Sequence, residues 1–160
     1  LLSWGQPGTD VGEFNIAHNI ATDKDGYVYV CDRENHRIQV FDRNGNFETL
    51  WVTLHRPCGI YIDEDEIVYV AELGWGNNVN REMPNIGPRI TAMDKNGNIL
   101  QRIGNNGYGF DTGQFVAPHG ICLDSNKDNY VAEVARTNMS HYTTPPDPVR
   151  RCQKLRQDQR

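Results

Sequence analysis

Short apolar runs alternate with turn residues along most of this chain, at a spacing typical of β-strands. Near the N-terminus, three runs rich in β-branched and aromatic residues are centred on Ile20, Val28 and Ile38. Polar turns separate them, and the third run is followed by Asn44-Gly45, a strong hairpin signal. A fourth apolar run occupies residues 47–51. This pattern predicts an antiparallel meander of four strands.

The same pattern recurs twice more with constant spacing. A spacing of 14 residues separates the leading residue of each copy from an acidic residue: His18 from Asp32, Cys58 from Glu72, and His119 from Glu133. The first two leading residues are 40 residues apart, which is the length of a propeller blade. We therefore predict an all-β fold, a β-propeller of about six blades of which this chain contains about three. Three blades cannot close a ring, because a propeller needs about four or more.

The repeat fixes the expected domain boundaries. One partial propeller is predicted over 1–160, with residues 1–5 as the last strand of a preceding blade and blades at 15–52, 58–104 and 119–157. The second blade carries an insertion at 73–88 and the third an insertion at 134–148. Because blade strands run antiparallel, both insertions should leave from the face on which the first strands begin. We expect the intact protein to extend further toward the N-terminus.

Composition and charge restrict the classes of partner that the protein can bind. The net charge of −5 disfavours a nucleic-acid surface, whose mark is a basic stripe, and no apolar run is long enough to cross a membrane. The four cysteines lack the close spacing of a zinc ribbon or redox pair, and Cys31 and Cys122 fit buried strand positions. We expect a small-molecule or peptide substrate and no nucleic-acid or membrane partner; the oligomeric state is left open.

Two of the leading residues are histidines. The first strand of a propeller blade lines the central channel, so His18 and His119 should point to a common axis. Two converging imidazoles can bind zinc with a third ligand from another blade and one position open to substrate. The alternative is that each imidazole only hydrogen-bonds at the channel mouth. Cys58 holds the equivalent position in the middle blade, where it is as readily explained by packing.

Three motifs carry a family resemblance: F-N-I-A-H at 14–18, D-R-E-N-H-R-I-Q at 32–39 and F-V-A-P-H at 115–119. They resemble NHL-repeat propellers, and in particular the peptidyl-α-hydroxyglycine α-amidating lyases (peptidylamidoglycolate lyases). The resemblance implies that His18 and His119 are zinc ligands and that Arg33 is a catalytic residue beside the metal and the substrate. It places a third zinc histidine and a catalytic tyrosine in blades N-terminal to this chain.

The activity implied by the resemblance is a zinc-dependent carbon–nitrogen lyase. Its substrate is a carbinolamide such as a peptidyl-α-hydroxyglycine, and its products are an amide and glyoxylate. The resemblance also implies a secreted or periplasmic protein, and it implies that these blades alone are inactive.

The chain departs from that family at four positions. Ala17 replaces the proline of the first P-H motif, and Gly120 replaces a calcium-binding aspartate, so a structural calcium is doubtful. Tyr29 and Val40 stand where animal lyases have a disulfide. These departures favour a distant, bacterial relative whose substrate differs.

Two other classes remain open. A non-catalytic NHL propeller would bind a protein or ligand on the loop-rich face. A calcium-dependent lactonase-type propeller would need converging carboxylates, for which Asp32, Glu72 and Glu133 are the candidates, although such repeat-equivalent residues more often cap turns. The metal content separates the three readings: zinc, none or calcium.

Overall fold

The chain folds into three antiparallel β-sheets, which confirms the all-β prediction. The computed structural model describes residues 1–75, 80, 83–104, 108–140 and 144–156. The first sheet has the strand order β3-β4-β5-β6. Its strands are β3 (Ala17–Thr22), β4 (Val28–Asp32), β5 (Arg37–Phe41) and β6 (Phe47–Trp51).

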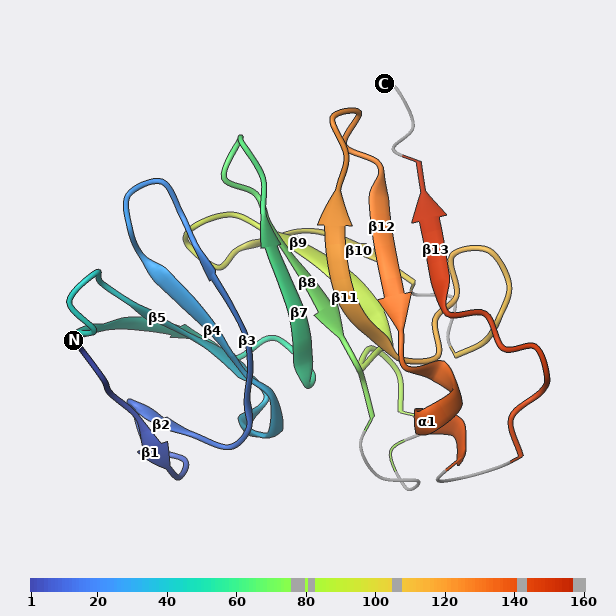
Figure 1. The fold of residues 1–160 in the computed structure, drawn as a ribbon, viewed down its shortest axis with the longest axis horizontal. Helices are drawn as coiled ribbons and strands as arrows, with labels where there is room; N and C mark the ends of the chain where they lie inside the picture. Colours follow the sequence, from blue (N-terminus) through green and yellow to red (C-terminus); the bar gives the residue numbers. More distant parts are fainter. Residues whose placement is uncertain (76–79, 81–82, 105–107, 141–143, 157–160) are drawn as a thin grey trace.

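The other two sheets repeat this order along the chain (Figure 1). The second sheet contains β7 (Pro57–Ile62), β8 (Val68–Glu72), β9 (Arg89–Met93) and β10 (Ile99–Ile103). The third contains β11 (Pro118–Leu123), β12 (Asn129–Glu133) and β13 (Cys152–Leu155). Each is a meander of neighbouring strands, consistent with partial blades of an NHL propeller.

Smaller elements accompany the three sheets. A short parallel pair, β1 (Gln6–Pro7) and β2 (Glu13–Phe14), precedes the first sheet. A 3-10 turn, η1 (Arg33–Asn35), joins β4 to β5, and helix α1 (Ala135–Ser140) follows β12. In the part of the chain that the structure describes, no helix is long and apolar enough to cross a bilayer.

Three expectations about these segments differ from this structure. Cys122, expected at a buried strand position, is exposed on β11, whereas Cys31 is buried as expected. Residues 1–5 form no strand, because a strand needs a hydrogen-bonded neighbour; instead Trp4 packs on Phe41, with ring centroids 5.6 Å apart. The insertion at 134–148, expected as a long loop, contains α1. Residues 76–79, 81–82 and 141–143 of the two insertions lie outside the described part of the chain.

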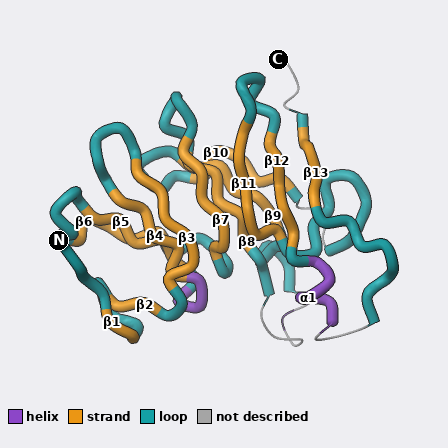
Figure 2. The backbone as a smooth tube through the Cα atoms, viewed as in Figure 1, coloured by secondary structure: helices purple, strands orange, loops and turns teal. Residues whose placement is uncertain are grey.

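The sheets stack through their flat faces. The first strands β3, β7 and β11 lie side by side, with β7 between the other two (Figures 1 and 2). Strands β4, β5, β8 and β9 are almost wholly buried on both faces. Their buried residues include polar and charged side chains as well as apolar ones: Asp32, Arg37, Gln39, Glu72, Arg89 and Thr91. The core between the first two sheets is made by Tyr29, Cys31, Ile38, Val40, Trp51, Leu54, Ile60, Val68, Val70 and Met93.

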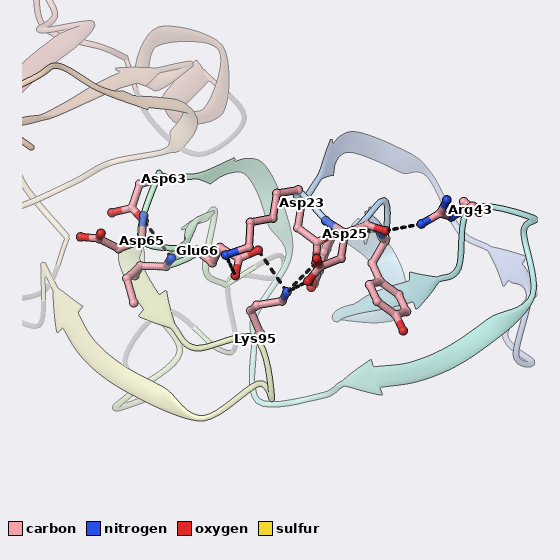
Figure 3. Close-up of polar contacts among 11 residues, drawn as sticks. Asp23, Asp25, Arg43, Asp63, Asp65, Glu66 and Lys95 are labelled. Carbon is pink, nitrogen blue, oxygen red and sulfur yellow. Dashed lines mark hydrogen bonds and ion pairs between the residues drawn. The ribbon is translucent and has the colours of Figure 1, made fainter.

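Ion pairs join neighbouring sheets at the edge of the molecule where the first strands end. The Lys95 ammonium lies 3.2 Å from Asp23, 2.7 Å from Asp25 and 3.0 Å from Glu66 (Figure 3). Lys127 of the third sheet similarly pairs with Asp65 of the second. Asp23 is fixed in its turn, because it accepts hydrogen bonds from the backbone N–H groups of residues 25 and 27. These contacts tie the blades together at the end of β3 opposite to His18.

Candidate metal centre

Each leading residue of the repeat stands at a β-bulge. In β3, Ala17 pairs with Asp32 and Asn19 with Cys31, so the register skips His18. The register of β7 skips Cys58, and that of β11 skips His119, in the same way. A bulged residue leaves the regular alternation and its side chain is re-aimed. The three side chains therefore share one geometry in three successive sheets.

The bulges converge on one point. The rings of His18 and His119 make an edge-to-face contact, with centroids 4.5 Å apart and an interplanar angle of 80°. One ring nitrogen of each histidine and the sulfur of Cys58 all lie within 4.8 Å of one another. Cys58 is fully buried, whereas both histidines are partly exposed. The structure thus brings together His18 and His119, as the sequence predicts, and adds Cys58.

A backbone contact fixes the tautomer of His18. Its Nδ1 lies 2.9 Å from the carbonyl oxygen of Cys58. A carbonyl only accepts, so Nδ1 must carry the proton and donate it; in the neutral ring this tautomer leaves the lone pair on Nε2. Metal-binding histidines are commonly oriented by such a hydrogen bond from the other ring nitrogen.

Glycine sets the distance between the second and third sheets at this point. A Cβ added to Gly59 would lie 2.6 Å from the carbonyl oxygen of His119, which is closer than real Cβ atoms come to backbone. The backbones of β7 and β11 can approach this closely only because residue 59 has no side chain. This approach places Cys58 next to His119.

Backbone hydrogen bonds hold the end of each second strand against the beginning of the first. The N–H of Arg33 donates to the carbonyl of Ile16, and that of Leu73 to the carbonyl of Arg56. The N–H of Val134 makes the equivalent bond to Ala117. Arg33 and both insertions are therefore attached on the face that carries the histidines.

Arg33 belongs to an ionic network that crosses from the first sheet to the second. Its Nε donates to Glu34 at 2.7 Å, and Glu34 also accepts from Arg56 at 2.9 Å. The positive charge of Arg33 also acts on the Cys58 thiol, whose pKa it lowers. Arg33 is mostly buried, with 19% of its side chain exposed. A positive charge is therefore fixed beside the cluster.

Burial and these charges shift the pKa values of the cluster. Burial lowers the pKa of His119, and the neighbouring His18 and Arg33 lower it further. Burial raises the pKa of the Cys58 thiol to about 11, against the opposing influence of Arg33 and Arg56. Burial opposes ionisation of Glu34, but its contacts with Arg56 and Arg33 prevail and lower its pKa. The His119 imidazole is therefore favoured in the neutral form that binds metals.

The three acidic residues of the repeat serve their own sheets. Asp32 accepts from Arg37 at 2.7 Å and from the backbone N–H of Asn15, while Glu72 binds Arg89 in the same way. Glu133 accepts from the backbone N–H groups of residues 116 and 117. All three are buried. They clamp the bulged end of each first strand, and their carboxylates are engaged there instead of converging on a calcium ion.

A second acidic group exists at the opposite end of β3. The carboxylates of Asp23, Asp25 and Glu66 lie within 4.8 Å of one another. The Lys95 ammonium already contacts all three, so a lysine supplies the compensating positive charge. The described residues therefore offer the His18, Cys58 and His119 cluster as the better metal centre.

Both insertions pack around this cluster. Their described parts contribute Leu73, Ala135 and Met139 to an apolar group that includes Cys58. The side chain of Arg56 also reaches the carbonyl of Trp75 in the first insertion, at 3.5 Å. The sequence predicts this placement from strand direction. It does not predict the partnership of Arg56 with Glu34, because no spacing in the repeat reveals a contact between sheets.

Comparisons with known proteins agree with the repeat. Residues 14–41 match the family model described as NHL repeat. The chain is 50% identical over 150 residues to NHL repeat-containing protein 3 from Homo sapiens, covering 89% of this chain and 40% of that protein. The protein of the same name from Mus musculus is 48% identical over 80 residues, covering 46% of this chain and 23% of its own length. The chain thus spans two fifths or less of these relatives, and both are animal proteins, which does not support the expected bacterial origin.

Solved structures add evidence on the fold alone. A Bacteroides caccae protein of unknown function superposes with a TM-score of 0.59 at 13% identity, covering 86% of this chain and 44% of its own. A catalytically inactive virginiamycin B lyase from Staphylococcus aureus, with quinupristin, gives 0.54 at 16% identity, covering 80% and 36%. The repeat match over residues 14–41 and the three meander sheets together show an NHL-repeat β-propeller-like domain.

Proposed function

We propose that the full-length protein is a zinc-dependent carbon–nitrogen lyase acting on a carbinolamide such as a peptidyl-α-hydroxyglycine. The observation that carries the proposal is the convergence of His18 and His119, two blades apart, beside a fixed Arg33. The substrate class comes from the resemblance of the P-H and D-R-E-N motifs to the amidating lyases. The donor set fits zinc, which accepts imidazole nitrogen readily, and does not fit calcium, which takes oxygen ligands.

The residues of this chain divide the work as follows. His18 and His119 would hold zinc, which supplies a Lewis acid that lowers the pKa of the substrate hydroxyl. Arg33 would bind the substrate carboxylate, and its ion pair with Glu34 keeps the guanidinium in place before substrate arrives. The hydroxyl loses its proton, the carbon–oxygen double bond forms, the C–N bond breaks and the nitrogen takes up a proton. A base outside this chain is expected to move these protons.

The test uses the full-length protein, with zinc content measured by mass spectrometry and glyoxylate release measured from N-benzoyl-α-hydroxyglycine. His18→Ala and His119→Ala should each lose zinc and activity. Arg33→Gln should keep zinc while kcat/KM falls roughly 10- to 150-fold, the cost of about 1.5–3 kcal/mol for a hydrogen bond to a charged group. His55→Ala is the matched control, since His55 also packs against a histidine, His36, at 5.9 Å but lies outside the cluster.

The results decide between this function and the alternative of a non-catalytic binding propeller. The packing of both insertions around the cluster favours that alternative, since loops on a rigid scaffold commonly bind partners. A full-length protein without zinc, or one whose zinc survives the double histidine substitution, would establish the binding propeller and overturn the lyase.

A further inference from the structure

We infer that Cys58 is the third protein ligand of the metal, so that three consecutive blades each contribute one donor from the same bulge position. The inference rests on the metal site of the proposed function and deepens it. The family resemblance instead implies a third histidine from a blade outside this chain. Cys58, the residue that the repeat places between the two histidines, supplies that donor here.

The first argument is positional. Cys58 is skipped in the register of β7 as His18 is in β3 and His119 is in β11. An ordinary core cysteine has a regular place in the sheet, as Cys31 does opposite Ile38 on β5. The sulfur of Cys58 is instead re-aimed toward the two imidazoles.

The second argument is distance. Tetrahedral zinc with Zn–N of about 2.0–2.1 Å and Zn–S of about 2.3 Å puts its donor atoms about 3.3–3.6 Å apart. The three candidate atoms here all lie within 4.8 Å of one another. Side-chain rotations alone can close the difference, because the backbones are already held together at Gly59.

The third argument is electrostatic. A coordinating thiol binds as the thiolate, and the metal itself displaces the proton. Arg33 and Arg56, which share Glu34 as their partner, place two positive charges near the sulfur, and such charges stabilise a buried anion. With Nδ1 of His18 donating to the Cys58 carbonyl, Nε2 is left to bind the same metal. Two imidazoles and one thiolate make a three-ligand site, the number typical of catalytic zinc with one position open.

This donor set also predicts metal preference. Thiolate and imidazole together select zinc or copper over magnesium and calcium, which prefer oxygen. The site should therefore not bind calcium, even when calcium is in large excess.

The experiment is zinc X-ray absorption spectroscopy on the full-length protein, combined with zinc titration against a chromophoric chelator. The wild type should show one sulfur at about 2.3 Å with nitrogens at about 2.0–2.1 Å. Cys58→Ala should lose the sulfur, and its zinc affinity should fall beyond the roughly 10–100-fold caused by losing an outer hydrogen-bond partner. Cys58→His should restore affinity with nitrogen alone, which separates loss of a ligand from loss of folding. Cys31→Ala is the control and should keep the sulfur.

The outcomes separate this inference from the proposed function. Zinc bound by nitrogen and oxygen alone in the wild type, with Cys58→Ala unchanged, would overturn the role of Cys58 and leave the histidine site intact. A wild type that binds no zinc would overturn both.

Discussion

The spacing between the second and third blades can be tested at Gly59. This glycine lies one residue after the bulged Cys58, and its missing side chain leaves room for the carbonyl of His119. Its backbone conformation is one that alanine also adopts, since its φ is not in the left-handed region. Replacing it by alanine therefore changes only the space between β7 and β11.

The structure gives the size of the perturbation. The added Cβ would lie 2.6 Å from the carbonyl oxygen of His119, whereas ordinary contact begins at 3.4 Å, so full relief of the contact takes a displacement of 0.8 Å. Overpacking of this kind costs about 1–3 kcal/mol, while replacing glycine by alanine restores about 0.4–1 kcal/mol through the unfolded state. We expect a net loss of about 1–2 kcal/mol in the free energy of unfolding.

The effect on metal binding should be larger than the effect on stability. Functional sites tolerate displacements of about 0.5 Å, so 0.8 Å between β7 and β11 should spoil simultaneous binding by Cys58 and His119. We expect zinc affinity to fall at least about tenfold in Gly59→Ala, with the protein still folded, as for other disturbances of a metal site. The measurements are urea unfolding and zinc titration of the full-length protein.

Gly120 provides the matched control. It is also on a first strand next to a cluster residue, but a Cβ there would meet only Ala132, at an ordinary 3.7 Å. Gly120→Ala should leave zinc affinity unchanged and stability equal or slightly raised. Equal zinc affinity in Gly59→Ala and wild type would refute the claim that this close approach assembles the site. An equal loss of zinc affinity in Gly59→Ala and Gly120→Ala would show that strand flexibility, and not the close approach at Gly59, determines the effect.

Two further predictions concern groups near the centre. Glu72→Gln breaks a fully buried ion pair in which Arg89 contacts both carboxylate oxygens, at 2.7 and 3.0 Å. The free energy of unfolding, measured by urea titration, should fall by about 3–5 kcal/mol, and a loss under about 1 kcal/mol would contradict this account. The second concerns His55, whose pKa is lowered below 6.5 by burial first and then by Arg89, His36 and Arg102, against the pull of Glu72. The unfolded state therefore binds more protons than the folded state as pH falls below 6.5, so protonation of His55 lowers the free energy of unfolding there. Between pH 7.5 and 5.5, the free energy of unfolding of His55→Ala should therefore rise relative to that of the wild type; parallel pH profiles of the two proteins would refute this.

The sequence predicts the strands well because each blade repeats the same local rules. The fourth strand expected at 47–51 is β6, and the 14-residue spacing identifies the three bulged positions as equivalent. Turn chemistry is captured less well. A two-residue Asn-Gly hairpin turn needs positive φ at both positions. Here only Gly45 has it, because Asp42 accepts the backbone N–H groups of residues 44 and 46 in a longer loop. Local patterns reveal the hairpin but not its exact hydrogen bonds.

Contacts between sheets could not be predicted. The pairing of Glu34 with Arg56 joins residues of different blades, and nothing in a 40-residue period says which charges meet across the gap. The same holds for Cys58. The repeat shows that Cys58 is equivalent in position to the two histidines, but it does not distinguish a metal ligand from a packing residue. Only the distances between the three side chains favour the ligand. What decides both is how closely the blades approach, and Gly59 sets that approach.

The two ends of the first strands are stabilised differently: one by ion pairs between sheets, the other by hydrogen bonds within each sheet. This difference explains how a repeated blade can carry a binding site. At the far end, acidic turn residues repeat and lysines from neighbouring sheets neutralise them, which fixes the blades relative to one another. At the near end, buried acids hold each bulge from within its own blade. The donor atoms are thus supported both within and between blades, as a preorganised site requires. A repeat supplies one such position per blade, and changing its residue between histidine and cysteine alters the ligand without altering the scaffold.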